Sequence, residues 1–220
     1  MATVIAEPTR VLVVDDDPLV RVGLRMLLNG DDLAVVGEAG DGAEAARQVD
    51  ALQPDVVLMD IRMPGVDGLT ATETIRGLPD PPEVIVLTTF DADEHVLRAL
   101  RAGAAGFLLK DTPPADILTA VHRVAGGDAQ LSPSVLRQLI SSVIATPPRG
   151  NAARERLATL TERELEVAHA IGEGLSNAEI ASRVYLSIPT VKAHVSAILR
   201  KLDADNRVQV ALLIHDAASG

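Results

Sequence analysis

Four short apolar runs of the sequence end in polar side chains that could hold a phosphoryl group and a divalent cation. Asp15 and Asp16 follow VLVV, Asp60 follows VVLM, Thr88 closes VIVLT and Lys110 follows GFLL. Three clustered carboxylates raise one another's pKa unless a cation lies among them. Acidic oxygens suit a hard ion such as Mg²⁺, which shares its coordination sphere with phosphate. The sequence therefore indicates a metal-assisted phosphate site, provided that the fold brings these residues together.

Each of these side chains has its own chemical use. Asp60 is the natural nucleophile, because carboxylates form aspartyl-phosphate intermediates. Lys110 supplies a fixed positive charge, and the Thr88 hydroxyl can donate to an anion. Such groups stabilise a phosphoryl group in transfer, where catalysis is mostly positioning and charge neutralisation. The third acid of the DDD run, Asp17, precedes Pro18 and is expected only to cap the next helix.

These residues can meet only if the first part of the chain folds as a parallel α/β sheet. Short aliphatic runs predict strands at 10–14, 34–38, 56–59, 84–88 and 106–109. Helical patterns predict helices at 18–29, 42–52, 68–76, 92–102 and 114–125. Alternating β and α elements with apolar strands are typical of a doubly wound sheet covered on both faces. Ligands of such sheets bind at the carboxyl ends of the strands, where the polar residues lie.

The motifs of this part resemble those of the receiver domains of two-component response regulators. The matching runs are VVDDD at 13–17, LMDIRMPGVDG at 58–68, VLTT at 86–89 and AGFLLKD at 105–111. The resemblance spans residues 10–126, and the motifs arrive in the family's order. It implies a five-stranded, flavodoxin-like parallel sheet of order 2-1-3-4-5, with residues 1–126 as the phosphoacceptor domain.

The resemblance also implies a phosphorylation site and its cofactor. Asp60 would be the phosphoacceptor, and Mg²⁺ the metal ion. Asp16 would bind the ion directly and Asp15 through water, while Asp60 and the backbone carbonyl of Arg62 would complete the protein ligands. The expected chemistry is autophosphorylation and autodephosphorylation of the receiver alone, without an external substrate.

Three further residues are implied to respond to phosphorylation. Lys110 would pair with the phosphoryl group, and Thr88 would move toward it. Phe107 occupies the family's aromatic switch position, although a plain core aromatic explains it equally well. Asp111 stands where many receivers have proline, so the resemblance does not carry a cis-proline to this position.

The pattern changes after residue 126. Segments rich in Pro, Gly and Ala predict an interdomain linker over residues 127–156, with a weak pattern for a short helix at 135–144. Further on the pattern is helical throughout, with helices expected at 161–173, 177–184, 188–202 and 206–215. Residues 157–220 therefore form a second, all-α domain of four helices.

Capping residues set the limits of these helices. Thr161 and Glu164 have the spacing of a capping box. Asn177 is expected to cap the next helix, and Ser187 the long one that follows. A short helix, a tight turn and a longer helix form a helix-turn-helix, whose second helix enters the major groove of DNA.

Polar and small residues of the long helix lie off its apolar stripe and could contact DNA. The candidates are Thr190, Lys192, Ala193, Ser196, Arg200 and Lys201. Lys192 can reach a guanine edge or a phosphate, and Ala193 can meet a thymine methyl. Arg200 and Lys201 are better placed for phosphates, which position the protein without reading sequence.

The runs LTERELEV, GLSNAEIA, TVKAHV, ILRKL and NRVQVALL resemble the LuxR-type helix-turn-helix of the NarL/FixJ regulators over residues 157–218. The resemblance implies a helix-turn-helix motif at 177–196, with base-reading positions at Lys192, Ala193 and Ser196. It further implies a sensor histidine kinase as phosphoryl donor, double-stranded DNA with paired half-sites as target, and a homodimer in the phosphorylated state. In related regulators the unphosphorylated receiver can mask the recognition helix.

Composition fits this interpretation and leaves some alternatives open. The net charge of −11 is concentrated in residues 1–130, whereas residues 151–220 carry 9 acidic against 8 basic side chains. A nearly neutral helical domain could instead bind protein. The chain has no cysteine, no long apolar stretch and no basic N-terminal region, so a soluble cytoplasmic protein without a membrane partner is expected. A phosphatase or phosphotransferase and a phosphorylation-independent scaffold are the rival functions.

Overall fold

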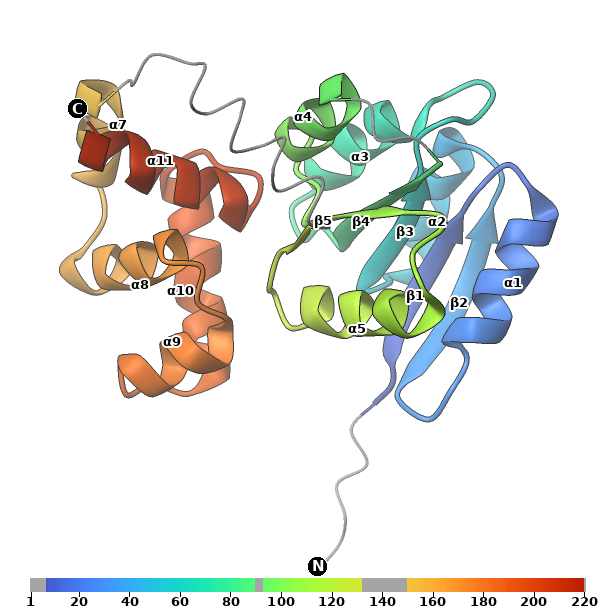
Figure 1. Cartoon of the computed structure of the whole chain (residues 1–220), viewed down its shortest axis with the longest axis horizontal. Coiled ribbons are helices and arrows are strands. Elements are labelled where there is room, and N and C mark those ends of the chain that lie inside the picture. The colour runs from blue at the N-terminus through green and yellow to red at the C-terminus, as the bar shows by residue number, and fades with distance from the viewer. Residues whose placement is uncertain (1–6, 90–92, 132–149, 220) are drawn as a thin grey trace, which may run out of the picture.

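The structure is a computed structural model that describes residues 7–89, 93–131 and 150–219. A helix-covered sheet and a purely helical bundle lie next to each other (Figure 1). The short helix that the sequence favours at 135–144 lies outside the described residues. No helix within the described ranges is long and apolar enough to cross a membrane.

The sheet is parallel throughout. Its strands are β1 (Thr9–Val14), β2 (Leu33–Ala39), β3 (Val56–Asp60), β4 (Glu83–Thr88), β5 (Gly106–Leu109) and β6 (Gln130–Leu131). They follow the order β2-β1-β3-β4-β5-β6, so the predicted order 2-1-3-4-5 is confirmed. The two-residue β6 adds to the edge beside β5 and was not predicted, because two residues carry no strand periodicity.

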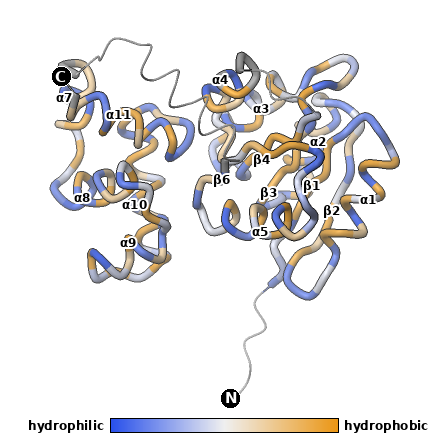
Figure 2. Tube along the Cα trace, viewed as in Figure 1, coloured by the Kyte–Doolittle hydropathy of each residue, from blue (hydrophilic) through white to orange (hydrophobic). Residues whose placement is uncertain are grey.

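Helices cover both faces of the sheet. They are α1 (Pro18–Leu28), α2 (Gly42–Leu52), α3 (Gly68–Arg76), α4 (Asp93–Arg101) and α5 (Pro114–Ala125). Leu24 of α1 and Val121 of α5 belong to one core cluster with Val11 and Val13. The alternate strand residues, such as Leu12, pack against α2 and α3. Central strands buried on both sides are apolar along their length, as Figure 2 shows.

The bundle contains one helix more than expected. Its helices are α7 (Gly150–Leu157), α8 (Glu162–Gly172), α9 (Asn177–Arg183), α10 (Ile188–Lys201) and α11 (Arg207–Ser219). All of helix α7 except Leu157 lies within the predicted linker 127–156, yet Ala153 and Leu157 are buried and α7 packs on α11. The segment from residue 150 onward is therefore part of the bundle. Its helical pattern was hidden by the flanking Pro and Gly residues.

Side-chain caps begin the bundle helices, with one correction to the expected set. Thr161 and Glu164 form the predicted capping box at α8, and Ser187 caps α10. The prediction that Asn177 caps α9 is wrong. Ser176 is the cap, and its backbone and hydroxyl bond Glu179 in a second capping box. Asn177 is instead the first residue of the helix.

Candidate functional site

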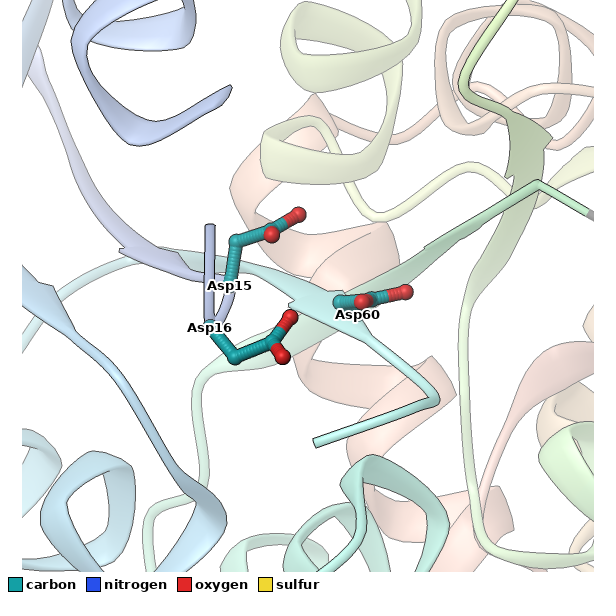
Figure 3. A group of neighbouring side chains, drawn as sticks. All are labelled: Asp15, Asp16 and Asp60. Carbon is teal, nitrogen blue, oxygen red and sulfur yellow. The ribbon is translucent and has the colours of Figure 1, made fainter. Parts of the chain in front are cut away.

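Three carboxylates meet at the carboxyl edge of the sheet (Figure 3). Asp15 and Asp16 follow β1, and Asp60 ends the neighbouring β3. One ligand oxygen from each lies within 4.8 Å of the others. Asp15 and Asp60 are buried, whereas Asp16 is exposed, so the cluster is open on one side. The parallel register of β1 and β3 brings together residues that are 45 positions apart, as the sequence predicted.

Lys110 lies between two of these carboxylates. Its Nζ is 2.6 Å from Asp15 Oδ2 and 3.1 Å from Asp60 Oδ2. Burial works to lower the pKa of Lys110, but the two carboxylates outweigh burial and raise it. Burial raises the pKa of Asp60 in spite of Lys110. Three carboxylates against one ammonium leave an excess of negative charge, and this oxygen-rich donor set fits a hard divalent cation.

Tight backbone contacts fix both acidic segments. Asp17 caps α1, as predicted, by accepting from Leu19 N at 2.8 Å. Its own N–H donates to Asp15 Oδ1 at 3.0 Å, which orients that buried carboxylate. On β3, a Cβ at Gly68 would lie 1.8 Å from the carbonyl oxygen of Asp60. Only glycine can therefore let the start of α3 approach the end of β3 this closely.

The other predicted receiver residues lie on β4, after β3 and on β5. Thr88 is the buried last residue of β4, and its carbonyl accepts from Lys110 N at 2.7 Å. Arg62, exposed, follows Asp60 by two residues. Phe107 is fully buried in a cluster with Leu100 of α4 and Val208 of α11, and so has the packing of a core aromatic.

Helix α10 carries all the predicted DNA-contact residues. Val191, Val195 and Ile198 are buried, as the apolar stripe predicted. The exposed candidates are Lys192, Ala193, Ser196, Arg200 and Lys201. Thr190 is half-buried, and its hydroxyl lies 2.7 Å from Ser187 Oγ.

Lys201 has a partner inside the bundle. Its Nζ donates to Glu164 Oε2 at 2.6 Å and so joins the end of α10 to the capping box of α8. This hydrogen bond, together with the backbone N–H of Thr161, lowers the pKa of Glu164 to about 2. In this structure Lys201 thus has a structural contact in addition to its candidate role toward phosphate.

Part of α10 faces the sheet domain. Lys192 Nζ donates to the carbonyl oxygen of Ala125 at 3.1 Å. A cavity of about 160 Å³ lies beside this contact, lined among others by Gly127, Ser196 and Leu199. Two of the three predicted base-reading residues, Lys192 and Ser196, therefore border the end of α5.

Sequence reasoning missed the polar contacts that join the two domains. Asn177 donates from its backbone N–H to Asp128 Oδ1 at 2.9 Å and from Nδ2 to Gly126 O at 2.7 Å. Arg207 Nη1 donates to Gly127 O and to Asp128 Oδ1, each at 2.8 Å. Burial lowers the pKa of Arg207, against the opposing effect of Asp128. No local sequence pattern predicts hydrogen bonds between residues that are 49 and 79 positions apart.

A second contact region lies where α11 begins. The buried Asn206 donates from Nδ2 to the carbonyl oxygens of Leu100 and Ala104, at 2.8 and 3.0 Å. Its Oδ1 accepts from Gln209 N at 3.0 Å, so one side chain both caps α11 and binds the end of α4. Val208, two residues further along the chain, packs in the apolar cluster that contains Phe107.

Comparison with known proteins agrees with this geometry. The response regulator receiver domain family matches residues 11–122, and the family of bacterial regulatory proteins of luxR type matches residues 158–214. Over 94% of this chain and 96% of its own length, the transcriptional regulatory protein LiaR of Bacillus subtilis is 41% identical. The nitrate/nitrite response regulator NarL of Escherichia coli K12 is 36% identical over 95% of this chain and 96% of its own.

A solved structure extends the likeness to the fold. The complex of the two-component response regulator RcsB with DNA is 26% identical, with a TM-score of 0.57, over 96% of this chain and 99% of that chain. Both domain families match in the order in which the structure places the sheet and the helix-turn-helix. The chain belongs to the two-component response regulators of the NarL/FixJ type, which join a receiver domain to a LuxR-type DNA-binding domain.

Proposed function

We propose that this response regulator is switched by Mg²⁺-dependent phosphorylation of Asp60, with a sensor histidine kinase as donor. The observation that carries the proposal is the convergence of Asp15, Asp16 and Asp60 around one point, with Lys110 Nζ within 3.1 Å of Asp60. A carboxylate nucleophile, further acidic oxygens and a fixed ammonium are the parts that phosphoryl transfer to aspartate requires.

The side chains divide the chemistry between them. Asp60 attacks phosphorus, so that a P–O bond forms as the bond from phosphorus to the donor nitrogen breaks. Asp16, Asp60, the carbonyl of Arg62 and, through water, Asp15 would hold Mg²⁺, which would neutralise charge on the phosphoryl oxygens. Lys110, already beside Asp60, pairs with the phosphorylated group. The Thr88 hydroxyl donates to it from the next strand.

The proposed output is release of the recognition helix α10. In the closed arrangement Lys192 is bonded to Ala125 O, so it is not available to DNA. Phe107 and Val208 share one apolar cluster, so a change at the receiver switch would reach the start of α11 directly. Opening of the domain contacts would free α10 for the major groove and permit dimers to read half-sites about 10 bp apart. The RcsB–DNA complex supports DNA as the target of this fold.

Labelling with a small-molecule phosphodonor and Mg²⁺ tests the site. We expect stoichiometric labelling of the intact chain and none of the Asp60→Ala variant. Asp17→Asn is the matched control, because it alters a cap of the same acidic loop whose carboxylate accepts from Leu19 N at 2.8 Å. Its labelling should stay close to that of the unaltered chain. Labelled Asp60→Ala would refute the assignment, and turnover of a phosphorylated metabolite would support a phosphatase instead.

A further inference from the structure

One arginine of α1 donates hydrogen bonds to the backbone of the acidic loop after β1. Arg21 Nη1 donates to the carbonyl oxygen of Asp15 at 2.7 Å and to that of Asp16 at 3.3 Å. These are the two residues of the loop whose carboxylates belong to the cluster in Figure 3. The guanidinium therefore fixes the peptide groups from which both carboxylates project.

Strand β2 in turn orients this arginine. Arg21 Nε donates to Glu38 Oε2 at 3.3 Å, and both side chains are partly buried. Glu38 pairs with Val13 in the β1–β2 register, and the carbonyl oxygen of the next residue, Ala39, accepts from Asp15 N at 3.1 Å. Asp15 is thus held at its N–H by β2 and at its carbonyl by α1, while its carboxylate faces Lys110.

We propose that Arg21, oriented by Glu38, is a positioning residue that sets the affinity of the acidic cluster for its divalent cation. The inference rests on the proposed function, which assigns Mg²⁺ to this cluster. Mg²⁺ demands near-ideal ligand geometry, so small rotations of the Asp15 and Asp16 peptides weaken binding. Groups that orient metal ligands typically change affinity by about 10- to 100-fold when removed.

A purely electrostatic role and a positioning role of Arg21 predict opposite changes in cation affinity when Arg21 is substituted. This difference makes the proposal testable. Removing a positive charge near three carboxylates should by itself tighten cation binding. Loss of the two carbonyl contacts of Arg21 should weaken it. A weaker affinity after substitution of Arg21 therefore reports positioning.

Arg25 provides a matched control on the same helix. Its Nη1 lies 3.0 Å from Glu38 Oε1, one turn along α1 from Arg21. Within the described part of the chain, no hydrogen bond joins it to the carbonyls of Asp15 or Asp16. Arg25→Met removes the same charge and a contact to the same glutamate, but leaves the loop in place.

The experiment measures Mn²⁺ binding to the intact chain by electron paramagnetic resonance, with Mg²⁺ as competitor. We expect Arg21→Met to raise the dissociation constant about tenfold, and Arg25→Met to change it less than about twofold. Addition of Glu38→Gln to Arg21→Met should bring no further loss, because Glu38 acts through Arg21. Unchanged or tighter binding by Arg21→Met, or equal weakening in both arginine variants, would overturn the proposal.

Mg²⁺-dependent labelling separates positioning from general damage to the fold. In Arg21→Met the Mg²⁺ concentration for half-maximal labelling should rise about tenfold, while the rate at saturating Mg²⁺ stays near that of the unaltered chain. A lower plateau at unchanged half-saturation would mean a merely structural role and would contradict the proposal. If the unaltered chain binds no Mn²⁺, the proposed function itself fails. If the unaltered chain binds Mn²⁺ and Arg21→Met binds it equally tightly, only the inference on Arg21 fails.

Discussion

At the scale of single residues, Lys192 has two mutually exclusive uses. In the closed chain its Nζ donates to Ala125 O at 3.1 Å, whereas on DNA the same ammonium would meet a guanine edge or a phosphate. If Lys192 contacts DNA as proposed, the receiver and DNA would compete for this side chain. Its substitution reports which kind of DNA contact it makes.

We predict that Lys192→Ala weakens DNA binding by the phosphorylated chain by about 1–3 kcal/mol and relaxes base preference. Binding of selected and scrambled sequences over a series of salt concentrations checks this. A uniform loss with a salt slope lower by about 0.9 would make Lys192 a phosphate contact instead. Arg47→Ala, which removes an exposed positive charge from α2 of the receiver, should leave both quantities unchanged.

Glu164 should make the stability of the bundle depend on acid pH. Lys201 and Thr161 lower its folded pKa from 4.5 to about 2, so its contribution is complete above pH 4.5 and is lost as the pH falls toward 2. Glu164→Gln should lower the free energy of unfolding by about 1 kcal/mol at pH 7. Urea unfolding at pH 7 and pH 3 should show the difference shrinking at the lower pH.

A matched capping-box residue serves as control for that prediction. Glu179 accepts from Ser176 as Glu164 does from Thr161, but it is exposed, and no lysine among the described residues pairs with it as Lys201 pairs with Glu164. Glu179→Gln should therefore cost less at pH 7. A pH-independent loss in Glu164→Gln would show that the ion pair with Lys201 contributes nothing.

The residue types of the sequence predicted the acidic cluster, but they did not predict that Arg21 binds the backbone of the loop that carries it. Asp15, Asp16 and Asp60 could be placed together because the carboxyl ends of parallel strands share one edge of the sheet. Arg21 gave no such signal, since an arginine on an amphipathic helix is usually solvated. Its contact with the carbonyls of Asp15 and Asp16 depends on the side-chain path rather than on sequence spacing.

At the scale of elements, the junction of β3 and α3 depends on Gly68. A Cβ there would lie 1.8 Å from Asp60 O, so Gly68→Ala must separate the helix from the strand end that carries Asp60. We expect a loss of about 1–3 kcal/mol in stability together with slower labelling of Asp60. Urea unfolding followed by circular dichroism, and labelling at saturating Mg²⁺, measure the two effects.

Gly23 of α1 gives the opposite expectation and serves as control. Apart from its own stretch of helix backbone, no atom lies within 4 Å of a Cβ built there, and the residue is exposed in mid-helix. Gly23→Ala should stabilise the chain by about 0.5–1 kcal/mol, because glycine loses more backbone entropy on folding. Equal effects of the two alanines would contradict the steric account of Gly68.

Elements with long periodic patterns were predictable, and short or interrupted ones were not. The strands and helices that precede the linker match the expected positions to within one or two residues. β6 and α7 were missed because the first has two residues and the second follows a Pro-rich stretch. At α9 both Ser176 and Asn177 suit a cap, and only the structure distinguishes them.

At the scale of the whole molecule, one set of the domain contacts is linked through Asp128. Its Oδ1 accepts from Asn177 N and from Arg207 Nη1, so it joins the start of α9 and the start of α11 to the turn after α5. These contacts could not be read from the sequence, because each domain would cap and pack its own helices without them. They depend on how the two domains pack against each other, which no local sequence pattern predicts.

We predict that Asp128→Ala shifts the unphosphorylated chain toward the open arrangement. Because apparent affinity scales with the fraction of open molecules, its binding to DNA should tighten by about five- to tenfold. The phosphorylated chain, which we propose is already open, should bind as before. Asp116→Ala, which removes an exposed charge from α5 at the end away from the contact, controls for weaker repulsion of DNA. Equal tightening in both variants, or in both phosphorylation states, would assign the effect to net charge. Linkage adds a reciprocal test, since DNA should promote labelling of Asp60 in the unaltered chain and do so less in Asp128→Ala.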